Sequence, residues 1–320
     1  MSKSLSVGLL ALLLIACADR SQAPAPTSVP HVAKQAPVAP AIASIAGAQR
    51  GEGKPYEIAN SQVWNVPDPV AGRDYQVFVA LPRSYADDPG RRYPVLYVTD
   101  ADYSFPLLQQ IARRLNGEGR AIDEFVLVGL SYAIGDEPMP SRRRDYTPTP
   151  EAGADTAPNA THGKADAYIA YLRDQVLPFV AQRYRTDERR RLFLGHSYGG
   201  LLGAQILLTA PEMFSGYILG SPSYWYGEHA MRVQEKTFAA THKDLPAQVY
   251  MYVGEYEQRR YGQNYDMVSD AQEMTRTLRS RGYPSLQLRL DVLNDEDHLS
   301  VAPRGFTHGL KFLLSIKNPR

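Results

Sequence analysis

Cysteine is almost absent from this chain of 320 residues, since Cys17 is the only one. A disulfide within the chain, a cysteine-based metal site and a thiol nucleophile are therefore excluded. The formal net charge of +1 gives no reason to expect a nucleic-acid partner. The sequence contains no internal repeat and no glycine-rich phosphate loop, and its apolar run at 5–15 is shorter than the ~20 residues that span a bilayer.

That apolar run follows Lys3, and this order is typical of a secretory signal. It ends in Leu14-Ile15-Ala16-Cys17, which resembles the lipobox of bacterial lipoproteins. The resemblance predicts a signal peptide over 1–17 and a mature protein lipid-modified at Cys17, exported and anchored in the cell envelope, facing the periplasm. An ordinary signal peptide, or a start codon placed too far upstream, is the alternative.

Residues 18–54 are rich in Ala, Pro, Ser and Gln and show no apolar periodicity. This composition predicts a disordered tether, which in polyproline form reaches on the order of 90 Å. We therefore expect the folded domain to occupy 55–320.

Alternating short apolar runs and helical stretches in this region predict an α/β fold with a mostly parallel central sheet and helices on both faces. Two antiparallel edge strands are expected at 57–66 and 75–81. A long amphipathic helix is expected at 264–281, and another helix at 165–184 with a kink or a restart at Pro178. The polar, proline-rich segment 135–163 is expected to form a lid. The remaining strands are expected at 93–98, 125–130, 191–194, 217–219, 248–253 and 286–292.

The motif Gly195-His196-Ser197-Tyr198-Gly199 lies between a predicted strand and an apolar helix. This G-x-S-x-G pattern is typical of the nucleophile elbow of α/β-hydrolases, in which a sharp turn exposes the serine. The sequence therefore indicates Ser197 as a nucleophile. A glycine-rich turn that carries a surface serine is the simpler alternative.

A serine nucleophile needs a histidine base, and the histidine needs a carboxylate to hold it. His298 lies in a polar loop directly after the last predicted strand, where its ring can reach Ser197. The acid is expected after the strand at 248–253, where both Glu255 and Glu257 stand. The usual spacing of three residues after the glycine favours Glu257, and Glu255 stays an alternative.

An oxyanion hole needs two backbone amides. The residue after the nucleophile, Tyr198, is expected to supply one. The second is expected from the loop after the strand at 93–98, from Asp102 or, as an alternative, Ala101. The Asp102 carboxylate is then expected to point away, because a negative charge would oppose the oxyanion.

Taken together, these motifs resemble the “Putative esterase” family of α/β-hydrolases, the group that contains the siderophore trilactone esterases. The resemblance extends from Tyr75 to the C-terminus. Its segments, besides the elbow and the acid and histidine positions, are 93–101, Arg143-Arg144-Asp145-Tyr146-Thr147-Pro148 and Ser221-Pro222-Ser223-Tyr224-Trp225. At Ala101 the chain departs from the glycine of the family pattern.

The resemblance implies hydrolysis of carboxylic esters through an acyl-enzyme, with no metal or organic cofactor. It also implies a small-molecule ester as substrate, such as a ferric catecholate siderophore in the cell envelope. Trp225 and Tyr103 are expected to stack on aromatic acyl groups. Arg144 is expected to meet an anionic ligand, with a salt bridge to Asp145 as the alternative. Another acyl substrate (a xylan ester, thioester or peptide), acyl transfer, or a non-catalytic binding lipoprotein are alternative functions.

Overall fold

A computed structural model describes residues 55–117, 121–150 and 160–316. The chain divides into two units, residues 1–55 and 56–320, and the second contains the helices and strands described below. The expected signal peptide, Cys17 and the tether 18–54 lie outside the described residues, as do 151–159 of the expected lid.

The second unit is built on one eight-stranded sheet with the order β1-β2-β4-β3-β5-β6-β7-β8 among the described residues. β1 and β2 pair antiparallel, as do β2 and β4, and the remaining neighbours are parallel. The strands are β1 (Ser61–Asp68), β2 (Arg73–Ala80), β3 (Tyr93–Thr99), β4 (Val126–Ala133), β5 (Thr186–His196), β6 (Gly216–Gly220), β7 (Gln248–Gly254) and β8 (Gln287–Leu293).

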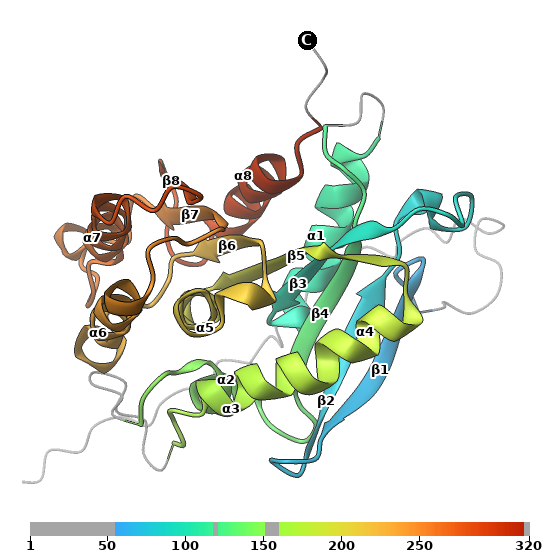
Figure 1. Cartoon of the computed structure of the whole chain (residues 1–320), viewed down its shortest axis with the longest axis horizontal. Coiled ribbons are helices and arrows are strands. Elements are labelled where there is room, and N and C mark those ends of the chain that lie inside the picture. Colours follow the sequence, from blue (N-terminus) through green and yellow to red (C-terminus); the bar gives the residue numbers. More distant parts are fainter. Residues whose placement is uncertain (1–54, 118–120, 151–159, 317–320) are drawn as a thin grey trace, which may run out of the picture. The chain divides into compact units, whose positions relative to one another are not determined.

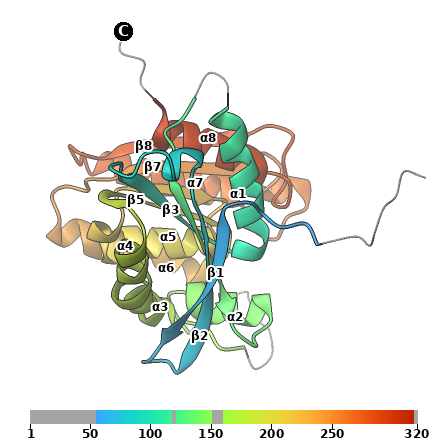
Figure 2. The same cartoon turned by 90° about the vertical axis from the view of Figure 1, so that its right-hand side faces the viewer.

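Helices cover both faces of this sheet. α1 and α8 pack on one face, and α3, α4, α5 and α6 pack on the other, as Figure 1 shows. The view turned by 90° shows α1 opposite α3 and α4 (Figure 2). The helices are α1 (Ala101–Leu115), α2 (Pro138–Tyr146), α3 (Ala165–Tyr171), α4 (Leu177–Arg183), α5 (Tyr198–Thr209), α6 (Tyr226–Thr241), α7 (Met267–Ser280) and α8 (Ala302–Leu314).

The central strand β3 illustrates why this sequence forms a sheet with two covered faces. All seven of its residues are buried, and side chains of successive residues point to opposite faces. Tyr93, Val95 and Tyr97 enter the core beneath α3 to α6. Leu96 and Val98 enter the core beneath α1 and α8. The predicted α/β-hydrolase architecture is thus confirmed.

Several boundaries differ from the expected ones. The first edge strand begins at Ser61 rather than near residue 57. The helix expected at 165–184 is α3 and α4 joined by one π-helical turn, Leu172–Val176. α4 begins at Leu177 with Pro178 in its first turn, which agrees with the expected restart rather than with a kink inside one helix. The described first half of the expected lid is not an open loop, because it forms α2, in which Ser141, Arg144 and Asp145 are buried.

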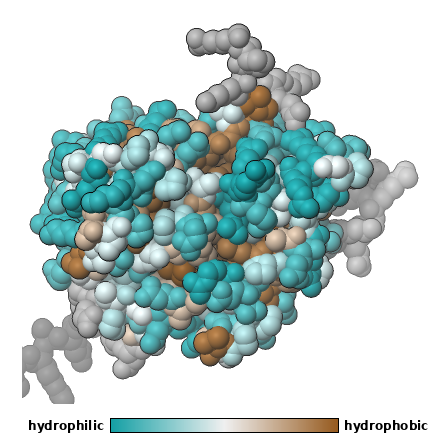
Figure 3. Space-filling model, in the orientation of Figure 1, coloured by the Kyte–Doolittle hydropathy of each residue, from teal (hydrophilic) through white to brown (hydrophobic). Residues whose placement is uncertain are grey.

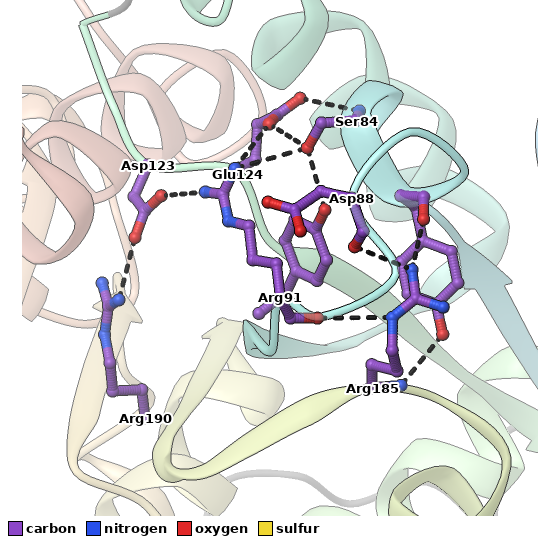
Figure 4. Close-up of polar contacts among 9 residues, drawn as sticks. Ser84, Asp88, Arg91, Asp123, Glu124, Arg185 and Arg190 are labelled. Carbon is purple, nitrogen blue, oxygen red and sulfur yellow. Dashed lines mark hydrogen bonds and ion pairs between the residues drawn. The ribbon is translucent and has the colours of Figure 1, made fainter.

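A polar network joins the segments that precede β3 and β4 to the first half of β5 and the residue before it (Figure 4). Asp123 accepts hydrogen bonds from Arg91 at 2.6 Å and from Arg190 at 2.8 Å. The buried Glu124 carboxylate accepts from the Ser84 hydroxyl at 2.6 Å. This network is structural and lies at the end of the sheet opposite the carboxyl ends of the parallel strands.

The face of the molecule seen in Figure 3 is mostly hydrophilic, with hydrophobic residues in small separate patches. Among the described residues, no helix combines the length and apolar character that crossing a membrane requires.

Candidate active site

The nucleophile elbow lies where β5 ends at His196 and α5 begins at Tyr198. Ser197 adopts φ 60° and ψ −119°, a strained conformation for a residue with a side chain. The turn is so tight that a Cβ on Gly195 would overlap the carbonyl of Gly199, and a Cβ on Gly199 would overlap the Thr99 hydroxyl. The glycines are therefore required by close backbone approach. The Ser197 amide donates to the Gly220 carbonyl at 2.8 Å, which fixes the turn against β6.

The carboxylate of Glu257 is 2% exposed and holds the ring of His298. His298 Nδ1 lies 2.6 Å from Glu257 Oε2. The other oxygen, Oε1, accepts from the Ser221 hydroxyl at 2.6 Å and from the Gly254 amide at 2.8 Å. Glu255, the alternative acid, instead accepts the backbone amide of Asp295 at 3.2 Å. The structure therefore places Glu257, and not Glu255, against His298.

Ser197 and His298 line one cavity of about 200 Å³, although they are about a hundred residues apart in sequence. The Ser223 hydroxyl lies 3.5 Å from the Ser197 hydroxyl. On one side the ring of Trp225 stacks on Tyr265 at 3.8 Å between centroids, with 3° between the planes. The remaining lining residues are Glu257, Gln263 and Met267. The cavity is thus lined by the polar side chains of Ser197, Ser223 and His298 and by the stacked rings of Trp225 and Tyr265.

The turn between β3 and α1 faces the elbow. Asp100 has left-handed backbone angles, φ 55° and ψ 50°, and its carbonyl accepts the amides of Tyr103 and Ser104. The amides of Ala101 and Asp102 precede these bonds in the first helical turn, where amides lack intrahelical acceptors. The Asp102 carboxylate accepts from Ser131 Oγ at 3.1 Å, so its charge is held toward β4.

His196, next to the nucleophile, connects the elbow to the His298 loop. Its Nε2 lies 3.0 Å from the His298 carbonyl oxygen, which can only accept, so Nε2 carries the proton. Nδ1 then accepts from the Tyr252 hydroxyl at 3.3 Å. Burial, together with the neighbouring imidazole of His298, lowers the pKa of His196 to about 3. His196 is therefore a neutral ring with a fixed tautomer.

Two residues expected to bind substrate are placed differently. Arg144 is 8% exposed and makes ion pairs with Asp145 at 2.8 Å and with Asp136 at 2.5 Å. Its expected contact with an anionic ligand is therefore corrected to the alternative, a structural salt bridge. Tyr103 is 51% exposed on the first turn of α1 and does not belong to the residues that line the cavity. Trp225 does line it, with one face of its ring covered by Tyr265.

Sequence reasoning missed an ion pair beside the elbow. Arg142 Nε donates to Asp100 Oδ1 at 2.8 Å, and the Tyr132 hydroxyl donates to the same oxygen at 2.9 Å. Asp100 lies within the segment 93–101 and Arg142 directly precedes the arginine-rich motif, but no sequence signal indicated that the two residues pair. Tyr265 was missed because its segment carries no motif.

No group of three or more His, Cys, Asp or Glu side chains is arranged to hold a metal ion within 55–117, 121–150 and 160–316.

Comparison with known families and proteins adds to this geometry. The family model described as “Putative esterase” matches residues 69–286. Ferri-bacillibactin esterase BesA of Bacillus subtilis is 27% identical over 84% of this chain and 94% of its own length. A siderophore enterobactin esterase of Emericella nidulans is 26% identical over 82% of this chain and 96% of its own.

Solved structures show the same fold. The BES protein from Bacillus cereus superposes with a TM-score of 0.73 at 23% identity, over 84% of this chain and 100% of that chain. Siderophore hydrolase EstB from Aspergillus nidulans superposes with a TM-score of 0.72 at 23% identity, over 84% and 99%.

Proposed function

The chain belongs to the “Putative esterase” family, and we propose that it is a serine carboxylesterase that works through an acyl-enzyme. One observation carries this proposal: the buried carboxylate of Glu257 lies 2.6 Å from His298 Nδ1, and the side chain of His298 lines the same cavity as Ser197. A carboxylate on Nδ1 keeps Nε2 free to accept a proton.

The proposed reaction assigns one role to each of these residues. Ser197 Oγ attacks the ester carbonyl carbon, and its proton passes to His298 Nε2. The carbonyl oxygen becomes an oxyanion, which the amides of Tyr198 and of Ala101 or Asp102 stabilise. As the carbon–oxygen bond breaks, the proton moves from His298 to the leaving alcohol. Water, deprotonated by the same ring, then attacks the acyl-enzyme and releases the acid and Ser197.

We propose a catecholate siderophore or a related aromatic ester as the substrate. Two observations support this class. Trp225 and Tyr265, which both line the cavity, provide aromatic surface against which an aromatic group of the substrate can pack. The curated relatives named above are esterases of bacillibactin and enterobactin by their names.

We further propose that the protein works in the cell envelope, anchored through lipid at Cys17. The lipobox-like segment 14–17 behind the apolar run supports this location. The test is metabolic labelling with a palmitate analogue in a bacterial host. Label and membrane association lost in Cys17→Ser would support the anchor, and a soluble, unlabelled wild-type protein would refute it.

Fluorophosphonate labelling tests the chemistry. Wild-type protein should be labelled, and Ser197→Ala should not be. The turnover of p-nitrophenyl butyrate should fall by ~10⁵-fold or more in Ser197→Ala. Wild-type protein that is neither labelled nor active would indicate a binding protein.

Incubation with ferric enterobactin then tests the substrate class. Linear products support it, whereas activity confined to xylan esters, thioesters or peptides, or acyl transfer to an added alcohol, would refute it.

A further inference from the structure

One guanidinium group contacts both sides of the proposed oxyanion hole. Arg142 projects from α2, and its side chain is 15% exposed. Its Nε donates to Asp100 Oδ1 at 2.8 Å and its Nη2 to Asp100 Oδ2 at 3.4 Å, a two-pronged contact that only arginine can make. The same Nη2 donates to the carbonyl of His196 at 3.4 Å. The guanidinium carbon also lies 5.6 Å from the centre of the Tyr198 ring.

These partners belong to two turns that carry different halves of the hole. Asp100 precedes Ala101 and Asp102, one of which is proposed to donate the first amide. His196 and Tyr198 flank Ser197, and Tyr198 is proposed to donate the second. The two turns are in close contact, because Asp100 Oδ2 lies 3.4 Å from the place where a Cβ on Gly199 would stand.

Both turns have backbone conformations that need support. Asp100 and Ser197 have φ values of 55° and 60°, in the left-handed region that residues with side chains rarely adopt. Such conformations persist only where surrounding contacts hold them. The bonds from Arg142 to the Asp100 side chain and to the carbonyl before Ser197 provide contacts of this kind to both turns.

The ion pair also controls a charge that would oppose catalysis. A bare carboxylate on Asp100 would repel an oxyanion formed nearby. Burial acts against the charge on Arg142, but the neighbouring Asp100 raises its pKa, so the guanidinium stays positive. Burial, with Asp100 beside it, also raises the pKa of Tyr132 far above its usual range, so the Tyr132 hydroxyl keeps its proton and donates to Asp100.

We propose that Arg142, paired with Asp100, is a positioning residue that fixes the spacing of the two halves of the oxyanion hole. The proposal rests on the proposed esterase function. It differs from a role in substrate binding, in which Arg142 would attract an anionic substrate and the ion pair with Asp100 would open.

The test compares Arg142→Gln and Arg142→Lys with Arg173→Gln as control, because Arg173 makes only an exposed ion pair with Asp174 on the π-helical turn. We measure kcat and KM on a neutral and an anionic p-nitrophenyl ester, and inhibition by phenylboronic acid. Loss of one oxyanion donor costs about 100-fold or more. We therefore expect kcat to fall about 100-fold for Arg142→Gln on both esters, with KM within about twofold and a comparable weakening of the boronate.

Lysine keeps the charge but not the fork, so Arg142→Lys should recover little activity. A loss confined to the anionic ester or to KM, full rescue by lysine, or kcat unchanged in Arg142→Gln would overturn the proposal. Inactive wild-type protein that resists fluorophosphonate would instead overturn the esterase function itself.

The melting temperature of Arg142→Gln reports whether this variant folds. If it does not fold, Asp100→Asn provides a second test. This variant removes the charge that Arg142 pairs with, and it should lower kcat at similar KM. Where both single variants fold, the double variant is measured as well. Its kcat should be less than about threefold lower than that of Asp100→Asn alone, because the two residues act as one unit. Two independent, multiplicative losses would show that they act separately.

Discussion

Replacing Glu257 by glutamine gives the sharpest test of the proposed proton relay, because the structure dictates how the new amide must sit. Oε1 of Glu257 receives hydrogens from the Ser221 hydroxyl and the Gly254 amide. A glutamine oxygen has to take this place, since an amide nitrogen there would face two donors. The NH₂ group then points at His298 Nδ1, 2.6 Å away in the native protein.

That arrangement forces the wrong tautomer of His298. Nδ1 must accept from the amide, so the proton moves to Nε2, which can no longer take the proton of Ser197. In serine hydrolases this kind of change lowers kcat about 10⁴-fold while geometry is kept. The loss corresponds to about 5 kcal/mol of transition-state stabilisation.

The assay is hydrolysis of p-nitrophenyl butyrate, with melting temperature as the measure of folding. Glu257→Gln should melt close to wild type, because its three hydrogen bonds can all be kept, and should still lose about 10⁴-fold in kcat. Glu255→Gln is the matched control and should stay within about twofold of wild type. Activity of Glu257→Gln within tenfold of wild type, or a larger loss in Glu255→Gln, would refute the reasoning.

Three further predictions concern other parts of the site. His196 has a folded pKa of about 3, below its unfolded value near 6.5, so the unfolded chain binds more protons as pH falls. The free energy of unfolding of the wild-type protein should therefore fall by up to about 1.4 kcal/mol per pH unit below pH 6.5, and that of His196→Asn should fall less steeply. Equal slopes of stability against pH in the two proteins, measured by melting at a series of pH values, would contradict this. Arg144→Leu leaves the buried Asp145 carboxylate without its cation and should lower the free energy of unfolding, measured by chemical denaturation, by about 3–5 kcal/mol. A decrease under 1 kcal/mol would contradict the structural role of the Arg144–Asp145 ion pair. Trp225→Ala should raise KM for a p-nitrophenyl benzoate at least fivefold more than for the acetate; equal effects on both esters would argue against an aromatic acyl pocket.

Part of this protein is determined by its sequence alone. Hydrophobic runs mark β3, β7 and the end of β5 at 192–194, and the glycines of 195–199 mark the elbow, because both signals depend on neighbouring residues only. The parallel sheet follows from alternating strands and helices. His298 and Glu257 stood out because each follows a strand whose carboxyl end meets that of β5 at one edge of the sheet.

The tertiary structure decided the partners of individual side chains. Glu255 and Glu257 are two residues apart in one loop. The conformation of this loop places the carboxylate of Glu257 in a buried position against His298, whereas that of Glu255 accepts the Asp295 amide. Arg142 and Arg144 stand in one short helix, yet one reaches Asp100 at the elbow and the other is enclosed with Asp145. Local sequence sets which elements form, whereas charge pairing and burial depend on atoms from distant segments. The proposed oxyanion hole and its supporting ion pair therefore emerge only when β3, α2 and β5 come together.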